Sequence, residues 1–174
     1  MTHLSARTFS LHKFFAMTVM ALFLSACGFQ LKGIVSLDES LKLAVINKTG
    51  QSSYSVFRPL ERNLEANGVK LVGNVAANYQ INLLEERQER RTSTISSSNS
   101  VDEYELRTTI TFEILDRNNE IVVAPQTLRL DRTYDYDANA QTASDAEESQ
   151  LRTEMSERLA DQIVRIYSAI KPAQ

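Results

Sequence analysis

A strict alternation of apolar and polar residues in the middle of the chain restricts the fold more than any other feature. Between residues 104 and 114, charged or hydroxyl side chains separate residues that suit a protein interior. Successive side chains of a β-strand point to opposite faces, so a two-residue period predicts a strand with one buried face and excludes a helix. The residues expected to face the core are Tyr104, Leu106, Thr108, Ile110, Phe112 and Ile114.

Strand patterns also precede and follow this segment. Tyr79, Ile81 and Leu83 alternate with neighbours, and the alternation returns at 128–136. The Ser- and Thr-rich stretch 92–100 predicts a hairpin tip toward which both adjoining strands extend. Residues 116–119 predict a tight turn, Pro125 an edge strand or a bulge, and the branched apolar run 41–46 a buried first strand.

Two segments have helical spacing instead. The first begins at about Ser53, carries Pro59 in its first turn and ends at Asn67-Gly68. The second begins at a capping-box pattern, Ser144 to Glu147, and continues to Pro172. Its apolar stripe consists of Leu151, Met155, Leu159, Ile163, Ile166, Tyr167 and Ile170.

Together these segments predict an α+β fold in the order β-α-β-β-β-α. Two amphipathic helices would pack on one face of a four-stranded, mostly antiparallel sheet, so that both helical stripes share one core. The other sheet face would then be polar and exposed.

The first 26 residues have the pattern of a cleaved signal peptide. His3, Arg7, His12 and Lys13 precede an apolar run too short to span a bilayer as a permanent helix. The run ends at Leu24-Ser25-Ala26-Cys27, which resembles a bacterial lipobox. We therefore expect diacylglyceryl modification of Cys27 and acylation of its freed amine, for example by palmitate. The predicted organisation is a signal at 1–26, a lipidated tether at 27–40 and one domain at 41–171.

Cleavage restricts the chemistry of the mature chain. It removes both histidines and makes the net charge two units more negative than the −3 of the full sequence. Without histidine or a free thiol, we expect no Ser-His or Cys-His catalysis, no metal site and no cofactor. The acidic balance argues against nucleic-acid binding. Paired carboxylates, such as Glu85-Glu86, Glu147-Glu148 and Asp135 with Asp137, leave a glycan hydrolase as a remaining enzymatic alternative.

The segment Cys27-Gly28-Phe29-Gln30-Leu31-Lys32-Gly33, together with the element order, resembles the opening and architecture of the LptE family of lipopolysaccharide-assembly lipoproteins. The resemblance implies an outer-membrane lipoprotein on the periplasmic side. Such a protein would plug the β-barrel LptD, assist its assembly and contact lipopolysaccharide on its way to the outer leaflet. Residue 28 is not Asp, and by resemblance to sorted lipoproteins this also favours the outer membrane.

Two sets of basic residues are candidates for these contacts. Arg107 and Arg129 lie on the expected polar sheet face and would meet the barrel. Arg87, Arg90 and Arg91 form the densest basic cluster and would meet lipid phosphates. Alternatively, these three arginines lie on a solvated strand face and pair with nearby glutamates. A different function, a stand-alone lipoprotein that binds an amphiphile between helices and sheet, also fits the sequence.

Overall fold

A computed structural model of the chain describes residues 37–50, 54–95 and 101–171. The chain divides into two compact units, Met1–Val35 and Ser36–Gln174, and every described residue belongs to the second. The predicted signal, Cys27, most of the tether and the distal part of the Ser-rich tip lie outside the described residues. Residues 37–40 of the predicted tether are described, and Leu37 packs against the core.

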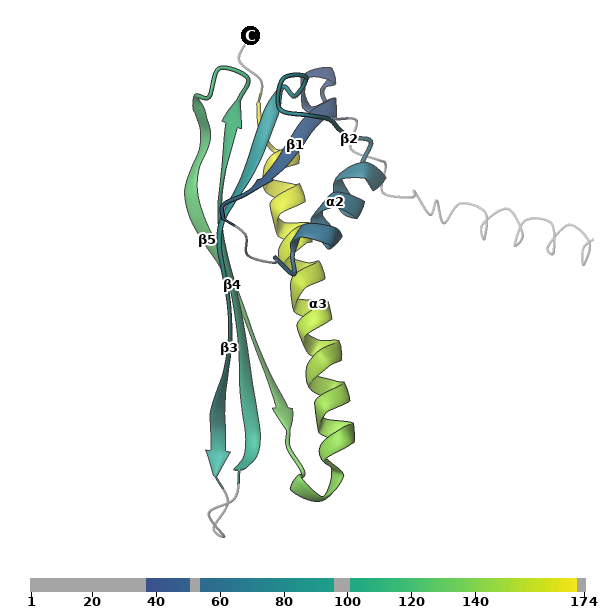
Figure 1. Cartoon of the computed structure of the whole chain (residues 1–174), viewed down its shortest axis with the longest axis vertical. Helices are drawn as coiled ribbons and strands as arrows, with labels where there is room; N and C mark the ends of the chain where they lie inside the picture. The colour runs from purple at the N-terminus through teal and green to yellow at the C-terminus, as the bar shows by residue number, and fades with distance from the viewer. Residues whose placement is uncertain (1–36, 51–53, 96–100, 172–174) are drawn as a thin grey trace, which may run out of the picture. The chain divides into compact units, whose positions relative to one another are not determined.

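The fold is α+β, as predicted, with both helices on one face of a single sheet (Figure 1). The sheet order is β2-β1-β3-β4-β5. The strands are β1 (Leu43–Lys48), β2 (Lys70–Leu71), β3 (Tyr79–Ile95), β4 (Val101–Asp116) and β5 (Ile121–Asp135). The helices are α2 (Phe57–Ala66) and α3 (Gln141–Ser168), with 3-10 turns η1 (Glu39–Lys42) and η2 (Ala138–Ala140).

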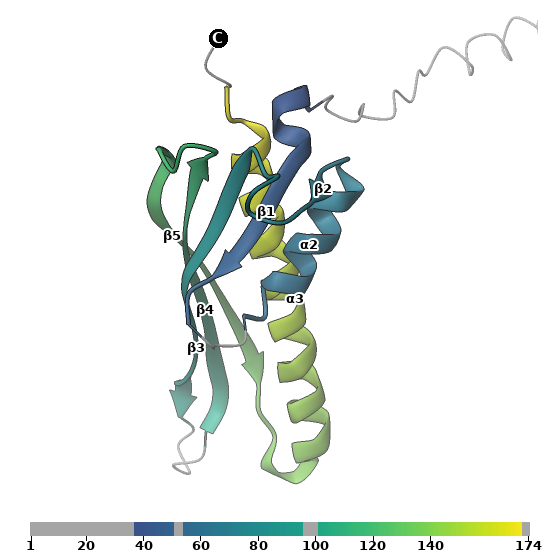
Figure 2. The ribbon, with the colours of Figure 1, turned by 45° about the horizontal axis from the view of Figure 1, so that its top comes forward.

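The sheet differs from the prediction in one strand. It has five strands, not four, because the two residues of β2 are too short to produce a periodic pattern. The sheet is also mixed: β1 runs parallel to β2 and β3, whereas the long strands β3, β4 and β5 are antiparallel. Figure 2 shows β1 ending midway along β3, and within the described residues β1 pairs with β3 only from Tyr79 to Leu83.

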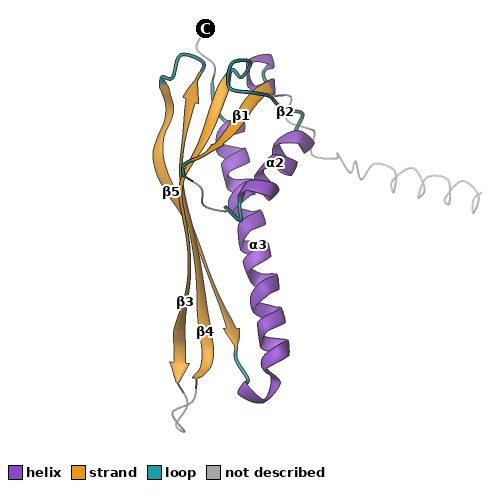
Figure 3. Ribbon diagram, in the orientation of Figure 1, coloured by secondary structure: helices purple, strands orange, loops and turns teal. Residues whose placement is uncertain are grey.

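The main core lies between the helices and the part of the sheet that includes β1 (Figure 3). The apolar stripe of α3 faces the sheet as predicted, and the alternation of β4 places Ile110, Phe112 and Ile114 inward. A smaller cluster, built on Leu106, Tyr134 and Met155, lies under the first half of α3. The helix therefore packs on two apolar clusters of unequal size.

A β-bulge at Leu84 changes which face of the sheet β3 presents to the helices. Leu83 is opposite the buried Phe112, but Glu85 is already opposite Thr111, so Leu84 is the additional residue. Beyond it, Glu86, Gln88 and Arg90 share the helix-facing side with buried residues of β4. The bulge thus brings polar side chains of β3 next to the helices.

Pro125 lies at an irregularity of the edge strand β5, as predicted. The register passes from Phe112 opposite Gln126 to Ile114 opposite Val123, which leaves one additional residue on β5. Proline lacks the N–H that a regular ladder position needs, and a bulge on an edge strand tolerates this loss.

The predicted helix starts need correction, whereas the end of α2 is confirmed. The helix α3 starts at Gln141, so Ser144 is not a cap; it is buried, and its hydroxyl accepts a bond from the Asp137 N–H at 3.2 Å. The helix α2 starts at Phe57, later than predicted. It ends at Asn67 and Gly68, whose φ of 86° is readily adopted only by glycine.

The first turn of α2 is capped by a residue from the sheet. Val56 offers no capping side chain, but Glu86 accepts bonds from the Ser55 N–H at 3.1 Å, the Ser55 hydroxyl at 2.6 Å and the Val56 N–H at 3.2 Å. A carboxylate at this position also interacts favourably with the helix dipole. The Leu84 bulge is what turns Glu86 toward α2.

We expect Glu86→Ala to lower the free energy of unfolding by about 1–2 kcal/mol, because two backbone N–H groups lose their acceptor. Urea denaturation of the domain measures this loss. Glu85→Ala is the matched control, since Glu85 faces the other side of the sheet and, among the described residues, pairs only with Arg87. Equal effects of the two substitutions would contradict the capping role.

Candidate functional site

The sheet face away from the helices, here called the outer face, carries a charged network on β4 and β5. Arg107 lies opposite Asp131 and bonds it through Nε at 2.7 Å, and it also pairs with Glu105 at 2.8 Å. Arg129 reaches the other oxygen of Asp131 at 2.6 Å. The bonds from Arg129 and Arg107 hold the pKa of Asp131 below its usual value despite partial burial. The two arginines predicted as barrel contacts therefore share one carboxylate.

These two arginines differ in how accessible they are. The Arg107 side chain is 18% exposed, because it lies between two carboxylates, whereas that of Arg129 is 52% exposed. Next to them, the hydroxyls of Thr111 and Thr127 bond each other at 2.8 Å across the strands. The outer face thus presents hydrogen-bonding groups with Arg129 as an accessible cation, a composition that suits a hydrated contact with another polar surface.

The basic cluster predicted on β3 is divided between two faces of the sheet. Arg87 and Arg91 lie on the outer face, where they pair with Glu85 and Glu89. Arg90 lies on the opposite face and bonds Glu148 of α3 at 2.9 Å. The three side chains therefore do not form one patch, and each already has an acidic partner.

Glu148 is the centre of a second network, which joins α3 to the sheet. It accepts bonds from Arg90 at 2.9 Å, from Arg152 at 2.7 Å and from the Tyr134 hydroxyl at 2.7 Å. Burial alone would raise the pKa of Glu148, but these bonds outweigh it and lower the pKa to about 2. Burial and the bond to Glu148 raise the pKa of Tyr134 to about 12. Arg90 also lies over the Tyr104 ring, 4.6 Å from its centre.

Sequence reasoning missed this network, because its members come from three distant segments. It treated Glu148 only as a member of the Glu147-Glu148 carboxylate pair, and it assigned Arg90 to a lipid-binding cluster. The one available signal was the concentration of tyrosines at the end of β5 and the start of β4. Only the bulge at Leu84, which the sequence does not mark, brings Arg90 to the helix side.

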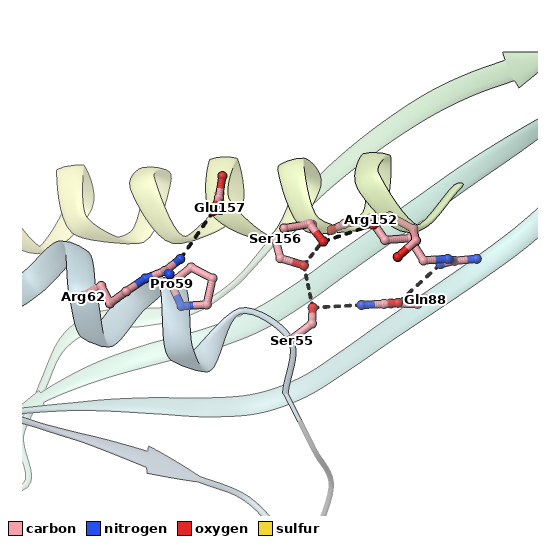
Figure 4. A pocket seen from close by; sticks show the side chains of 9 residues that line it. Ser55, Pro59, Arg62, Gln88, Arg152, Ser156 and Glu157 are labelled. Carbon is pink, nitrogen blue, oxygen red and sulfur yellow. Dashed lines mark hydrogen bonds and ion pairs between the residues drawn. The ribbon is translucent and has the colours of Figure 1, made fainter. Parts of the chain in front are cut away.

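Two adjoining pockets lie beside α3, a larger one of about 390 Å³ lined by residues of α2, β3 and α3, and a smaller one of about 340 Å³ lined by residues of β3 and α3. Both are lined by Ser149 and Arg152. In the larger one, Ser55 bonds Ser156 at 2.7 Å and receives a bond from Gln88 at 2.8 Å (Figure 4). The hydroxyl, amide and guanidinium groups in this lining suit the polar part of a ligand.

The space between helices and sheet, where an amphiphile would have to bind, is occupied by packed side chains. Leu60 from α2, Ile163 from α3 and Phe112 from β4 are each 0% exposed. Within the described ranges, no group of three or more His, Cys, Asp or Glu residues could hold a metal ion. None of the helices in the described part of the chain is long and apolar enough to cross a membrane.

A family model described as lipopolysaccharide-assembly, LptE, matches residues 39–165. The chain belongs to the LptE family. The matched region contains the five strands, α2 and all but the last three residues of α3, so membership rests on nearly the whole described domain and not only on the motif after Cys27. This confirms the family predicted from the sequence.

Individual relatives agree with this assignment. The chain is 26% identical over 167 residues to the LPS-assembly lipoprotein LptE of Pectobacterium atrosepticum, covering 94% of this chain and 89% of that protein. A minor lipoprotein from Acinetobacter baumannii is 30% identical, with a TM-score of 0.62 over 77% of this chain and 97% of that one. A lipoprotein B from Nitrosomonas europaea is 26% identical, with a TM-score of 0.70 over 82% and 91%. The LptE-family fold thus recurs in lipoproteins.

Proposed function

We propose that this chain is an outer-membrane lipoprotein, anchored through Cys27 on the periplasmic side, that binds an LptD-type β-barrel and acts with it in lipopolysaccharide transport to the outer leaflet. The observation that carries the proposal is the LptE-family match over residues 39–165. The lipobox at 24–27 and the lipoproteins among its relatives support the anchor. No enzymatic step is part of this function.

The outer face is the surface we assign to the barrel. A domain enclosed in an aqueous lumen has to match polar groups of the surrounding wall, and the network around Asp131 holds its charged groups in place before any partner binds. Arg129 is the cation of this network that a partner carboxylate can reach most easily, because half of its side chain is exposed.

For lipopolysaccharide, the phosphate ligands we propose are Arg87 and Arg91, since they remain on the exposed face of β3. Binding would require each guanidinium to exchange its glutamate partner for a phosphate. Arg90 belongs to the same stretch, but its charge is engaged by Glu148. Its reversal would disturb α3 and is not a clean test of lipid binding.

The experiment is purification of the full chain from outer membranes together with whatever barrel it binds. We expect Arg129→Glu to reduce the co-purified barrel about tenfold or more at unchanged abundance, because the new carboxylate faces Asp131 and repels acidic groups of a partner surface. Arg158→Glu is the matched control, since Arg158 is exposed on α3, far from the outer face.

The outcomes separate the parts of the proposal. Cys27→Ser should remove the protein from the membrane fraction, and an unmodified Cys27 thiol in the unsubstituted protein would contradict the anchor. Unchanged barrel recovery with Arg129→Glu would contradict the assigned face. A lone monomer that carries extractable lipid would favour the stand-alone amphiphile-binding lipoprotein instead.

A further inference from the structure

Large exposed hydrophobic side chains gather at one end of the folded unit. Val75 is 100% exposed, Ile121 62% and Val122 40%. Val75 lies in the loop between β2 and β3, and the other two lie at the start of β5; Figure 1 shows both segments at the top of the picture. Ile95, 58% exposed, lies at the far end of β3. We call the first end the entry end, because β1 begins there.

Hydrogen bonds join the segments of the entry end into one surface. Asn78, at the end of the β2–β3 loop, donates to the carbonyl of Ser40 at 2.9 Å and accepts a bond from Arg117. Gln80 donates to Asn119 in the β4–β5 turn at 2.9 Å. The three connections η1, β2–β3 and β4–β5 are therefore held together, so their exposed apolar groups keep fixed positions relative to one another.

The described chain also enters the folded unit at this end. Leu37 packs against the core, Asp38 caps η1, and the Tyr167 hydroxyl at the end of α3 bonds the Leu41 carbonyl at 2.6 Å. Cys27 precedes Leu37 by ten residues, which span at most about 36 Å when fully extended. A lipid on Cys27 would therefore keep the entry end near the membrane surface.

The loop that carries Val75 is suited to contact with lipid. Residues 72–78 include no charged side chain, so contact of Val75 with lipid headgroups desolvates no ion of the loop itself, although Arg117 of the β4–β5 turn bonds Asn78. A single valine binds weakly, but a covalent anchor supplies a high local concentration of membrane, which makes weak contacts effective.

We propose that the entry end is a membrane-contact surface, with Val75 placed among the lipid headgroups and Ile121 and Val122 at the same interface. The entry end would contact the same membrane leaflet that holds the lipid on Cys27. This contact would hold the anchored domain in one orientation. The proposal rests on the lipidation of Cys27 but not on the identity of the barrel.

The chain contains no Trp, so a single introduced Trp reports on one position only. The experiment places the lipidated full chain in phosphatidylethanolamine–phosphatidylcholine vesicles, with or without brominated phosphatidylcholine, which quenches nearby Trp fluorescence. We expect Val75→Trp to emit at shorter wavelength on the vesicles and to lose at least half of its fluorescence to the brominated lipid. Ile95→Trp, at the opposite end, is the matched control and should show neither effect.

Each other outcome has a distinct meaning. If the protein sediments with the vesicles but Val75→Trp is not quenched more than Ile95→Trp, the membrane contact is wrong while the anchor stands. If the protein does not sediment with the vesicles, the anchor itself fails. A blue shift of Val75→Trp that depends on protein concentration and not on brominated lipid would assign this end to a second copy of the chain, and would overturn the proposal.

Discussion

Replacement of Ile163 by Asp is expected to unfold the domain. Ile163 is 0% exposed, in the part of α3 that packs on the main core with Leu60 and Phe112. A carboxylate there would have no described cationic partner, and burying an unpaired charge costs several kcal/mol, a large part of the 5–15 kcal/mol by which domains are typically stable. Leu159→Asp should act in the same way. Thermal denaturation followed by circular dichroism measures the effect.

Arg158→Asp is the control for this prediction. It introduces the same carboxylate into the same helix at an exposed position, so any general loss of helix propensity appears in both variants. We expect the control to melt within a few degrees of the unsubstituted domain. An unchanged melting curve for Ile163→Asp would mean that the stripe of α3 does not face a core.

The second large effect is expected at Glu148. Its folded-state pKa of about 2 lies below the ordinary value of 4.5, so its network contributes stability above pH 4.5 and loses that contribution as the pH falls toward 2. Glu148→Gln should therefore lower the free energy of unfolding at pH 7 by roughly 2–3 kcal/mol and flatten its dependence on pH between 5 and 2. Urea denaturation at a series of pH values measures both effects.

Glu147→Gln is the control, because the carboxylate of Glu147 is next to Glu148 on the same helix but is exposed. It removes one charge near the same point without touching Arg90, Arg152 or Tyr134. We expect the control to keep the pH dependence of the unsubstituted domain. Parallel pH curves for the two variants would contradict the network as the cause.

The sequence predicted those parts of the fold that depend on regular burial. The alternation of β4 and the stripe of α3 each place a side chain of the right kind at every inward position, so period alone identified both elements. Asn67-Gly68 predicted the end of α2, and in the structure Gly68 adopts the positive φ that such an end requires. Arg107 and Arg129 were assigned to one polar face, and the structure joins them through Asp131.

The missed features depend on tertiary structure that leaves no local pattern. β2 is too short to show a period, and its two residues are strand only because Leu43 and Ala44 lie beside them. The helix α3 starts at Gln141 and not at Ser144, whose hydroxyl instead accepts a bond from the Asp137 N–H just before η2. The bulge at Leu84 has no Gly or Pro to mark it, yet it decides that Glu86 and Arg90 face the helices.

The unequal packing of α3 gives the two ends of this helix different resistance to local opening. From Leu159 to Tyr167 the helix is part of the main core, so we expect its amide protons to exchange only when the whole domain unfolds. From Gln141 to Met155 it rests on the small cluster and on the bonds to Glu148, so this half can leave the sheet at a lower free energy. We therefore expect the α3 wall of the two pockets to separate transiently from the sheet while the rest of the domain stays native.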